Sequence, residues 1–461
     1  MSKLKYICSV LVLCNVIFFS CKIGSKYQRP VMDGMPHSFE AKGLEEGEAA
    51  DIGWSTLYKD SVLQNMITKA LDHNRDVLIA TARINEMIAN KRISFANIFP
   101  EIGIDGVAQK EHLNYGGNNP KYTPEIHTNL TFGWEVDIWG KLRWANDAAI
   151  ASYMQSVEAQ QALRLTIIAE VAQSYFKLRA LDRELEIVKQ TLEALQESAH
   201  FAKLRHEGGL TSEMPYRQSL VEVARTEPLI PSLENEIKLM ENNMSVLLGE
   251  FPSGIPRSNT DISTHSILPG LPVDVPSSLL ERRPDVIQAE QKLIEANAKV
   301  GVALTSILPS LNLTGRLGAE NSELTDFLKS PAWFIGSSLA GPIFNMGKNK
   351  AIHQAAKAAY QQEVYSYEKT ILSVFMEVNN AINTYQKTQE VRKSRETLYS
   401  SVRSYQKLAR LQYVNGIVSY MDVLDAQRQL FDAEITLNNA ILDELTSTVQ
   451  LYKALGGGLV K

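Results

Sequence analysis

The stretch Asn129–Lys141, NLTFGWEVDIWGK, joins an alternating segment to a very long uninterrupted one. Apolar side chains occupy every second position, and polar or small ones lie between them: Leu130, Phe132, Trp134, Val136 and Ile138 against Asn129, Thr131, Gly133, Glu135 and Asp137. Such strict alternation predicts a β-strand whose two faces meet different surroundings. Gly140 ends the pattern, and residues 141–207 contain neither proline nor glycine. One long helix is therefore expected to follow the strand.

The expected helix carries a heptad repeat. Small and apolar residues recur at alternating intervals of four and three: Ser174, Leu178, Leu181, Leu185, Val188, Leu192, Leu195, Ala199 and Ala202. This spacing is typical of helices that pack lengthwise against other helices. At 1.5 Å per residue the helix would be about 100 Å long, far longer than an ordinary globular helix. A strand joined to such a helix argues against a half-buried soluble sheet.

The first half of the chain contains further elements around this pair. An extended arm, rich in glycine, proline and charge, covers residues 25–53, and a Pro/Gly/Ser-rich connector covers 251–276. Between them we expect a helix from Ser61 to Phe99, a strand through 101–109, a polar hairpin loop at 110–125, and a returning helix from Ser212 to near Gly249. Ser212 is placed to cap that last helix, and Pro228 and Pro231 should kink it.

The second half of the chain repeats the first. Several pairs recur at an offset of 207 residues: Gly140-Lys141 with Gly347-Lys348, Gly209 with Gly416, Ser212 with Ser419, and Leu248-Gly249 with Leu455-Gly456. The second copy predicts strands at 311–319 and 332–344, a long helix at 348–414 and its partner at 419–455. We expect two repeats, about 61–250 and 277–456.

The duplicated layout predicts an α+β membrane protein. Four strands of roughly ten residues have the length of tilted membrane-spanning strands. Four strands cannot close a barrel, and lipid tolerates no open sheet edge. Each chain would therefore contribute four membrane β-strands to an oligomeric β-barrel, and its long antiparallel helices would form a second, coaxial α-barrel.

Composition and charge narrow the classes of function. The chain has 461 residues, 44% hydrophobic content and a mean hydropathy of −0.15, which excludes a bundle of membrane helices. The net charge of −5 gives no support to a nucleic-acid partner. The apolar run Tyr6–Phe19, preceded by Lys3 and Lys5, is too short to span a bilayer and is typical of a signal peptide.

Cysteine usage predicts a lipid anchor. Cys8 and Cys14 lie in the signal segment, so Cys21 is the only cysteine after it and no internal disulfide is possible. The sequence Phe18-Phe19-Ser20-Cys21 resembles a bacterial lipobox, with phenylalanine at the position where leucine is usual. We expect residues 1–20 to be a lipoprotein signal peptide and Cys21 to be the acylated N-terminus of a mature chain, 21–461.

Four motifs carry a family resemblance: Phe132–Arg143, Leu271–Val286 with its Arg282-Arg283-Pro284-Asp285, Gly416–Arg428, and Leu451–Gly458. With these motifs the chain resembles the TolC-like outer-membrane efflux channels, specifically the NodT-like lipoprotein branch of RND-type efflux systems. The resemblance covers nearly everything from Lys26 to Gly458.

The resemblance implies a homotrimer in the cell outer membrane, with a twelve-stranded barrel and a long periplasmic helical barrel. It implies an exit duct that passively passes drugs or other small toxic compounds, with a periplasmic adaptor and an inner-membrane RND pump as partners. An outer-membrane channel of an ABC-type protein secretion system and, from another class, a secreted coiled-coil scaffold are the alternatives.

The turns at 208–212 and 415–419 place the ends of all four long helices at the far tip. Asp422 and Asp425 follow the second turn at a spacing of three, so they share one helix face, and Arg428 is placed to pair with Asp425. The resemblance implies that Tyr413, Met421, Asp425 and Arg428 hold the periplasmic entrance closed. Threefold symmetry would gather Asp422 and Asp425 into an acidic, cation-selective constriction. Met421 and Ser419 depart from the family, where leucine and asparagine are commoner.

Motifs for other chemistry are missing from the sequence. It contains no Gly-x-x-x-x-Gly-Lys-Ser/Thr loop for a nucleotide, and its eight histidines are scattered without a His-x-x-x-His pair. We therefore expect no metal site, no cofactor and no enzymatic activity.

Overall fold

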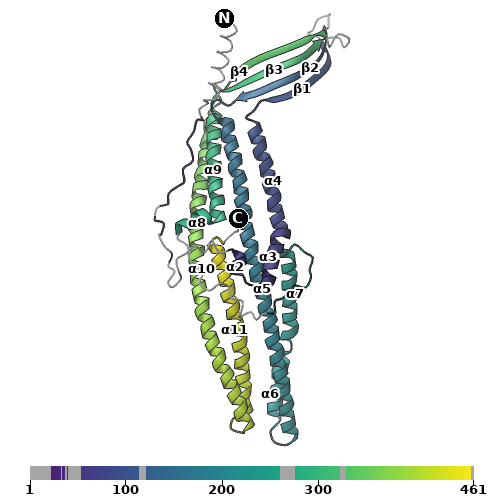
Figure 1. The fold of residues 1–461 in the computed structure, drawn as a ribbon, viewed down its shortest axis with the longest axis vertical. Coiled ribbons are helices and arrows are strands. Elements are labelled where there is room, and N and C mark those ends of the chain that lie inside the picture. The colour runs from purple at the N-terminus through teal and green to yellow at the C-terminus, as the bar shows by residue number, and fades with distance from the viewer. Residues whose placement is uncertain are drawn as a thin grey trace. The chain divides into compact units, whose positions relative to one another are not determined.

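The computed structural model describes residues 22–32, 34–36, 39, 53–113, 121–259, 276–321 and 329–457 (Figure 1). The predicted signal peptide and Cys21 lie outside these residues. The chain divides into two compact units, each assembled from separate segments. Unit 1 comprises Met1–Asp33, Ala82–Glu158 and Ile287–Lys369, and unit 2 comprises Gly34–Thr81, Ala159–Val286 and Thr370–Lys461.

Unit 1 contains one antiparallel sheet of four strands in the order β1-β2-β3-β4. The strands are β1 (Glu101–Leu113), β2 (Lys121–Val136), β3 (Ser310–Asn321) and β4 (Pro331–Ala340). Leu130 lies opposite Ile104 on one side and Leu317 on the other, and Leu317 lies opposite Trp333. Strands from both halves of the chain therefore form one continuous sheet, as the duplication requires.

Helical segments accompany this sheet in unit 1. They belong to α4 (Arg75–Ala96), α5 (Lys141–Glu207), α9 (Pro284–Thr305) and α10 (Lys348–Val414). Three tryptophans in and just after the opening motif donate their indole N–H to backbone carbonyls of neighbouring segments. Trp134 donates to Ile98, Trp139 to Pro309 and Trp144 to Ile23, over 2.8–3.0 Å. The motif thus fixes the place where the strand gives way to the long helix.

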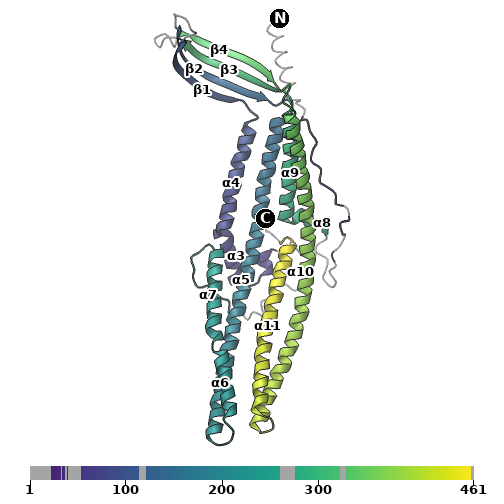
Figure 2. The same ribbon diagram turned by 180° about the vertical axis from the view of Figure 1, so that it is seen from behind.

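Unit 2 is built from helices, with its core around the middle of α5. The remaining helices are α2 (Trp54–Leu57), α3 (Ser61–His73), α6 (Met214–Thr226), α7 (Leu229–Leu247), α8 (Pro276–Arg282) and α11 (Tyr420–Ala454). Figures 1 and 2 show α11 alongside α10, and α6 and α7 alongside α5. Leu178, fully buried in this core, contributes about 1.5–3 kcal/mol by leaving water.

The long helices have the predicted bounds. α5 and α10 each contain 67 residues, and α10 begins 207 residues after α5. None of the nine heptad positions from Ser174 to Ala202 is exposed, which confirms lengthwise packing of this face. Among the described residues, no helix is both long and apolar enough to cross a membrane.

The predicted helix from Ser61 to Phe99 is two helices, α3 and α4, separated at Asn74. The Asn74 side chain explains the break, because its Oδ1 accepts from the Asp76 and Val77 amides at 2.9 and 3.3 Å. Its Nδ2 donates to the carbonyl of Leu247 over 2.9 Å. An asparagine that caps one helix and also binds another chain segment is held in extended backbone.

Several predicted ends were also wrong. β1 continues to Leu113 and β2 begins at Lys121, so the hairpin loop is shorter than the predicted 110–125. β2 ends at Val136, before the predicted Ile138, because Asp137 accepts from the amides of Leu142 and Arg143 and caps α5. β4 ends at Ala340 and not Phe344. Ser212 does not cap α6, because the N-cap residue of that helix is Glu213.

At Pro228 the predicted kink is a break, since α6 ends at Thr226 and α7 begins at Leu229, whereas Pro231 lies within α7.

Candidate functional site

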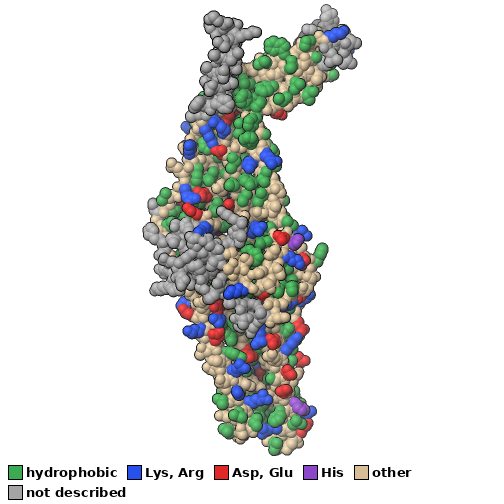
Figure 3. Space-filling view, viewed as in Figure 1, with side chains coloured by type: hydrophobic (Ala, Val, Ile, Leu, Met, Phe, Trp, Pro, Cys, Tyr) green, Lys and Arg blue, Asp and Glu red, His purple; other side chains and the backbone are tan. Residues whose placement is uncertain are grey.

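The sheet presents two faces of opposite character. On one face the large apolar side chains are exposed: Ile102, Ile104, Leu130, Phe132, Leu317, Trp333, Ile335 and Leu339. Figure 3 shows hydrophobic side chains gathered over the sheet, with few charged ones among them. The other face carries Asp105, His127, Asn129, Thr131 and Arg316. An exposed apolar band of this size on one face is suited to contact with lipid.

The two turns at the helical tip of unit 2 have the same geometry. Gly209 and Gly416 have φ angles of 71° and 73°, in the left-handed region that favours glycine. The amide of Leu210 donates to the Arg205 carbonyl, and the amide of Ile417 donates to the Gln412 carbonyl, each over 2.9 Å. Both long helices therefore end in a Schellman motif, which confirms the predicted turns.

Tyr413 packs inside this tip. Its ring centroid lies 5.5 Å from that of Tyr420, and the Arg205 guanidinium lies 5.0 Å from the Tyr413 centroid. Tyr413 also contacts a small buried cluster of Tyr420, Val423 and Leu424. These contacts hold the end of α10 against the beginning of α11.

Asp422 closes the first turn of α11. Its Oδ2 accepts from the backbone amide of Ser419 at 2.8 Å and from the Ser419 hydroxyl at 2.6 Å. Ser419 and Asp422 form a capping box, which satisfies amides that the helix leaves unpaired. The hydrogen bonds from Ser419 hold the pKa of Asp422 below its ordinary value of 3.8.

Arg428 does not bind Asp425, contrary to the predicted pair. Its Nη2 donates to Glu222 Oε1 on α6 over 2.6 Å, whereas Asp425 accepts from Gln429 Nε2 over 2.7 Å. The Glu222 side chain is only 7% exposed, and that of Arg428 is 47% exposed. The hydrogen bond to Glu222 raises the pKa of Arg428. This contact joins α11 to α6 within the tip.

Asp425 and Met421 are exposed on α11. The structure thus brings Tyr413 and the first turns of α11 together, and leaves Met421, Asp422 and Asp425 with surfaces facing outward.

The Arg282–Asp285 stretch of the second motif has a definite role in the fold. Arg283, 7% exposed, donates Nε and Nη2 to the two carboxylate oxygens of Asp285 at 2.9 and 2.7 Å, and Nη2 also to Glu377 at 2.8 Å. Its Nη1 donates to the Ala454 carbonyl at the end of α11 over 2.9 Å. One side chain therefore joins the start of α9, the middle of α10 and the C-terminus of α11.

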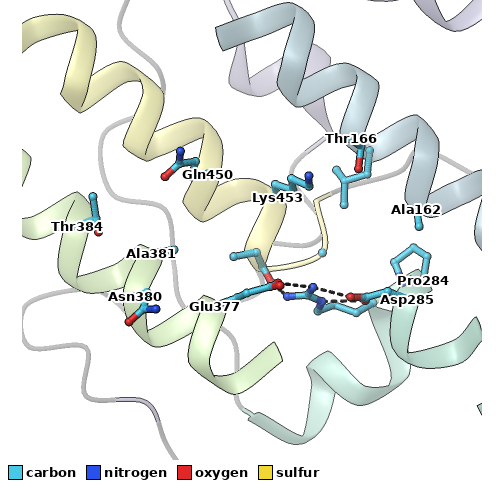
Figure 4. A pocket seen from close by; sticks show the side chains of 14 residues that line it. Ala162, Thr166, Pro284, Asp285, Glu377, Asn380, Ala381, Thr384, Gln450 and Lys453 are labelled. Carbon is cyan, nitrogen blue, oxygen red and sulfur yellow. Dashed lines mark hydrogen bonds and ion pairs between the residues drawn. The ribbon is translucent and has the colours of Figure 1, made fainter. Parts of the chain in front are cut away.

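A pocket of about 490 Å³ lies beside Arg283 (Figure 4). Its lining includes Thr166, Glu377, Asn380, Gln450 and Lys453. In the close-up, dashed lines run between the labelled Glu377 and Asp285 side chains, which Arg283 bridges. No sequence signal pointed to this pocket, because its residues come from four separate parts of the chain.

The N-terminal arm is fastened to α9 within unit 1. Arg29 donates Nε and Nη2 to the two carboxylate oxygens of Glu290 at 2.7 and 2.6 Å, and the Tyr27 hydroxyl donates to the same carboxylate at 3.1 Å. Burial and the nearby Glu290 carboxylate raise the pKa of Tyr27. Lys22 pairs with Asp147 of α5. The residues just after Cys21 are thus tied to the helices by charge.

Comparison with known proteins gives a family match over most of the chain. The model of the outer membrane efflux protein family matches residues 66–250 and 275–457. The cation efflux system protein CusC of Escherichia coli K12 is 30% identical over 461 residues, which cover 98% of this chain and 99% of CusC. The solvent efflux pump outer membrane protein SrpC of Pseudomonas putida is 32% identical over 413 residues, 87% of this chain and 86% of SrpC.

Solved structures have the same fold. A crystal structure of CusC covers 95% of this chain and 100% of its own, with a TM-score of 0.86 and 30% identity. The open state of the MtrE outer membrane channel of Neisseria gonorrhoeae covers 95% of this chain and 99% of its own, with a TM-score of 0.88 and 26% identity.

Proposed function

Because this chain belongs to the outer membrane efflux protein family, we propose that it is the exit duct of a tripartite RND-type efflux system. The chain is an efflux channel protein of the outer membrane, with an internally duplicated α+β fold. In the proposed system a periplasmic adaptor and an inner-membrane RND pump deliver the cargo, and the duct passes it to the exterior without chemistry of its own.

The sheet carries this proposal. Its apolar face is exposed on all four strands, and among the described residues β1 and β4 each pair with one strand only, which leaves an open edge on both. Lipid would leave the backbone groups of such edges unsatisfied, at several kcal/mol each. Other copies must therefore pair with β1 and β4, and three copies would supply twelve strands. The polar face would then line the passage.

The tip supports a closed entrance. In a trimer, three copies of Asp422 and Asp425 would gather near the axis, with Met421 as an apolar ring and Tyr413 behind them. The contact between Arg428 and Glu222 holds α11 against α6 and opposes any outward movement of α11. An adaptor that opens the duct would have to break this contact, which is partly exposed and so costs little.

The arm supports a lipid anchor at Cys21. The amide of Ile23 donates to the carbonyl of Trp139 over 3.1 Å, directly after β2. The residue two positions after the proposed acylation site is therefore held near the end of a proposed membrane strand. Cells fed labelled palmitate should label the wild type and leave Cys21→Ala unlabelled. Equal labelling of both proteins would contradict the lipoprotein hypothesis and the proposed signal peptide, 1–20.

The cargo is proposed only as a class. CusC is named for cations and SrpC for solvents, so relatives of similar identity to this chain serve different cargo. We assign small toxic compounds to this duct, and their selection to the pump.

Mass and conductance of the detergent-solubilised protein test the duct. The mass should be three times that of the mature chain, and the protein should form pores in planar bilayers. Asp425→Ala should raise conductance or reduce cation preference. A stable, conducting monomer, or a trimer that never conducts, would contradict the proposal.

A further inference from the structure

The polar face of the sheet contains a hollow of about 380 Å³. Its lining comes from all four strands: Glu101 and Gly103, Thr131 to Gly133, Thr314 to Arg316, and Phe334. Gly133 forms an open part of its floor, since a Cβ added there would have no neighbour within 4 Å. The hollow therefore exists because glycine occupies a position where other residues would fill it.

Phe334 forms one wall of the hollow. Its ring lies over Gly336, because a Cβ at Gly336 would come within 2.6 Å of the Phe334 ring. The ring therefore lies flat along the sheet, towards Gly336. It borders the hollow without filling it. Phe334 is 53% exposed on the polar face, although it is aromatic. An exposed aromatic ring beside a hollow is suited to stacking on a planar molecule.

Arg316 lies directly beside this ring. It is the cross-strand partner of Phe334 on one side and of Thr131 on the other. Arg316 is the cation that lines the hollow, and among the described residues no carboxylate binds it. Its guanidinium is exposed, so its five donors are available to a solute.

From these residues we propose that the hollow binds planar organic anions, such as aromatic sulfonates and carboxylates. The Arg316 fork binds the anionic group, the Phe334 ring stacks on the planar body, and the floor at Gly133 admits it. This inference rests on the proposed function, because the polar face must line the passage. Each protomer would place one such site on the route of exit and favour this class of cargo.

Block of ion current in planar bilayers tests the site. The probe is 2-naphthalenesulfonate, added on the side of the bilayer opposite the helical tip. Methanesulfonate, which has the charge and lacks the ring, is the control. Naphthalenesulfonate should block the wild-type pore reversibly, and methanesulfonate should not. Arg316→Gln should weaken the block about tenfold, the change expected for one lost charge-assisted contact. Arg316→Lys should be intermediate because it keeps the charge and loses the fork.

Two further variants distinguish binding in the hollow from simple attraction to the charge of Arg316. Gly133→Leu fills the hollow while Arg316 remains, and should weaken the block as Arg316→Gln does. Glu320→Gln changes a charge elsewhere on the polar face and should leave the block unchanged. The proposal would be overturned if block survived in both Arg316→Gln and Gly133→Leu. It would also be overturned if block were lost in Arg316→Gln and retained in Gly133→Leu, because the charge alone would then explain it. Conductance without the probe shows that each variant assembles. If the wild type never conducts, the proposed duct fails and this inference fails with it.

Discussion

Arg428 and Glu222 join two helices of the tip: Nη2 of Arg428 donates to Oε1 of Glu222 over 2.6 Å, across 206 residues of sequence. Glu222 is nearly buried and contacts Arg225 more loosely, at 3.6 Å. The tip therefore depends on a contact between helices from the two halves of the chain.

Breaking this contact should loosen the closed entrance. Arg428→Ala and Glu222→Gln should each raise single-channel conductance, and the double variant should add little, because both remove one interaction of about 1 kcal/mol. Arg225→Ala is the matched control, since Arg225 is largely exposed and should change conductance little. Wild-type conductance in both single variants would show that the contact does not restrain α11.

The first turn of α11 should depend on pH. Hydrogen bonds from Ser419 depress the pKa of Asp422, so their contribution is fully present above pH 3.8 and is lost as pH falls through the depressed value. The protection of the Ser419 and Asp422 amides, each measured relative to its intrinsic exchange rate, should fall only in that acidic range. Ser419→Ala should exchange quickly at neutral pH already. Equal exchange in the wild type and Ser419→Ala at pH 7 would contradict the capping box.

Arg283 should be essential to the stability of unit 2. Arg283→Ala removes the partner of the Asp285 carboxylate, which is 38% exposed, and of the Ala454 carbonyl, which should lower the free energy of unfolding by about 1.5–3 kcal/mol. The neighbouring Arg282→Ala, at a half-buried position, should lower it far less. Denaturant unfolding in detergent, followed by circular dichroism, measures both. Equal losses in the two variants would show that the contacts of Arg283 are not special.

Glu290→Gln should release the N-terminal arm, because one buried carboxylate receives both Arg29 and Tyr27. Trypsin should then cut after Lys26 faster than in the wild type. Glu363→Gln, which removes the more exposed pair with Lys292, should leave cleavage of the arm unchanged. Unchanged cleavage in Glu290→Gln would mean that other contacts hold the arm.

The long helices could be predicted from the sequence because their signals are local. Heptad spacing, the absence of glycine and proline, and glycine at each end fixed α5 and α10 to the residue. The break at Asn74 was missed because it depends on the Leu247 carbonyl, 173 residues away. The sequence contains nothing local that marks this contact.

At the tip, too, local features were predictable from the sequence and long-range contacts were not. Local spacing paired Arg428 with Asp425, three residues away, whereas the structure pairs it with Glu222. Similarly, the Arg282–Asp285 motif identified the family, but the partners of Arg283 at Glu377 and Ala454 depend on tertiary packing. The hollow beside Arg316 required the register of all four strands.

The central claim is that the sheet faces lipid on one side and an aqueous duct on the other. Cysteine accessibility at alternating positions of the sheet tests it most directly. Cys21 is the only cysteine after the proposed signal peptide, so single cysteines can be placed in a Cys21→Ala background. In proteoliposomes, a water-soluble maleimide should modify Thr131→Cys and Thr314→Cys on the polar face and spare Leu130→Cys and Leu317→Cys on the apolar face. Equal modification at neighbouring positions of both faces would contradict a lipid-facing sheet that lines an aqueous duct.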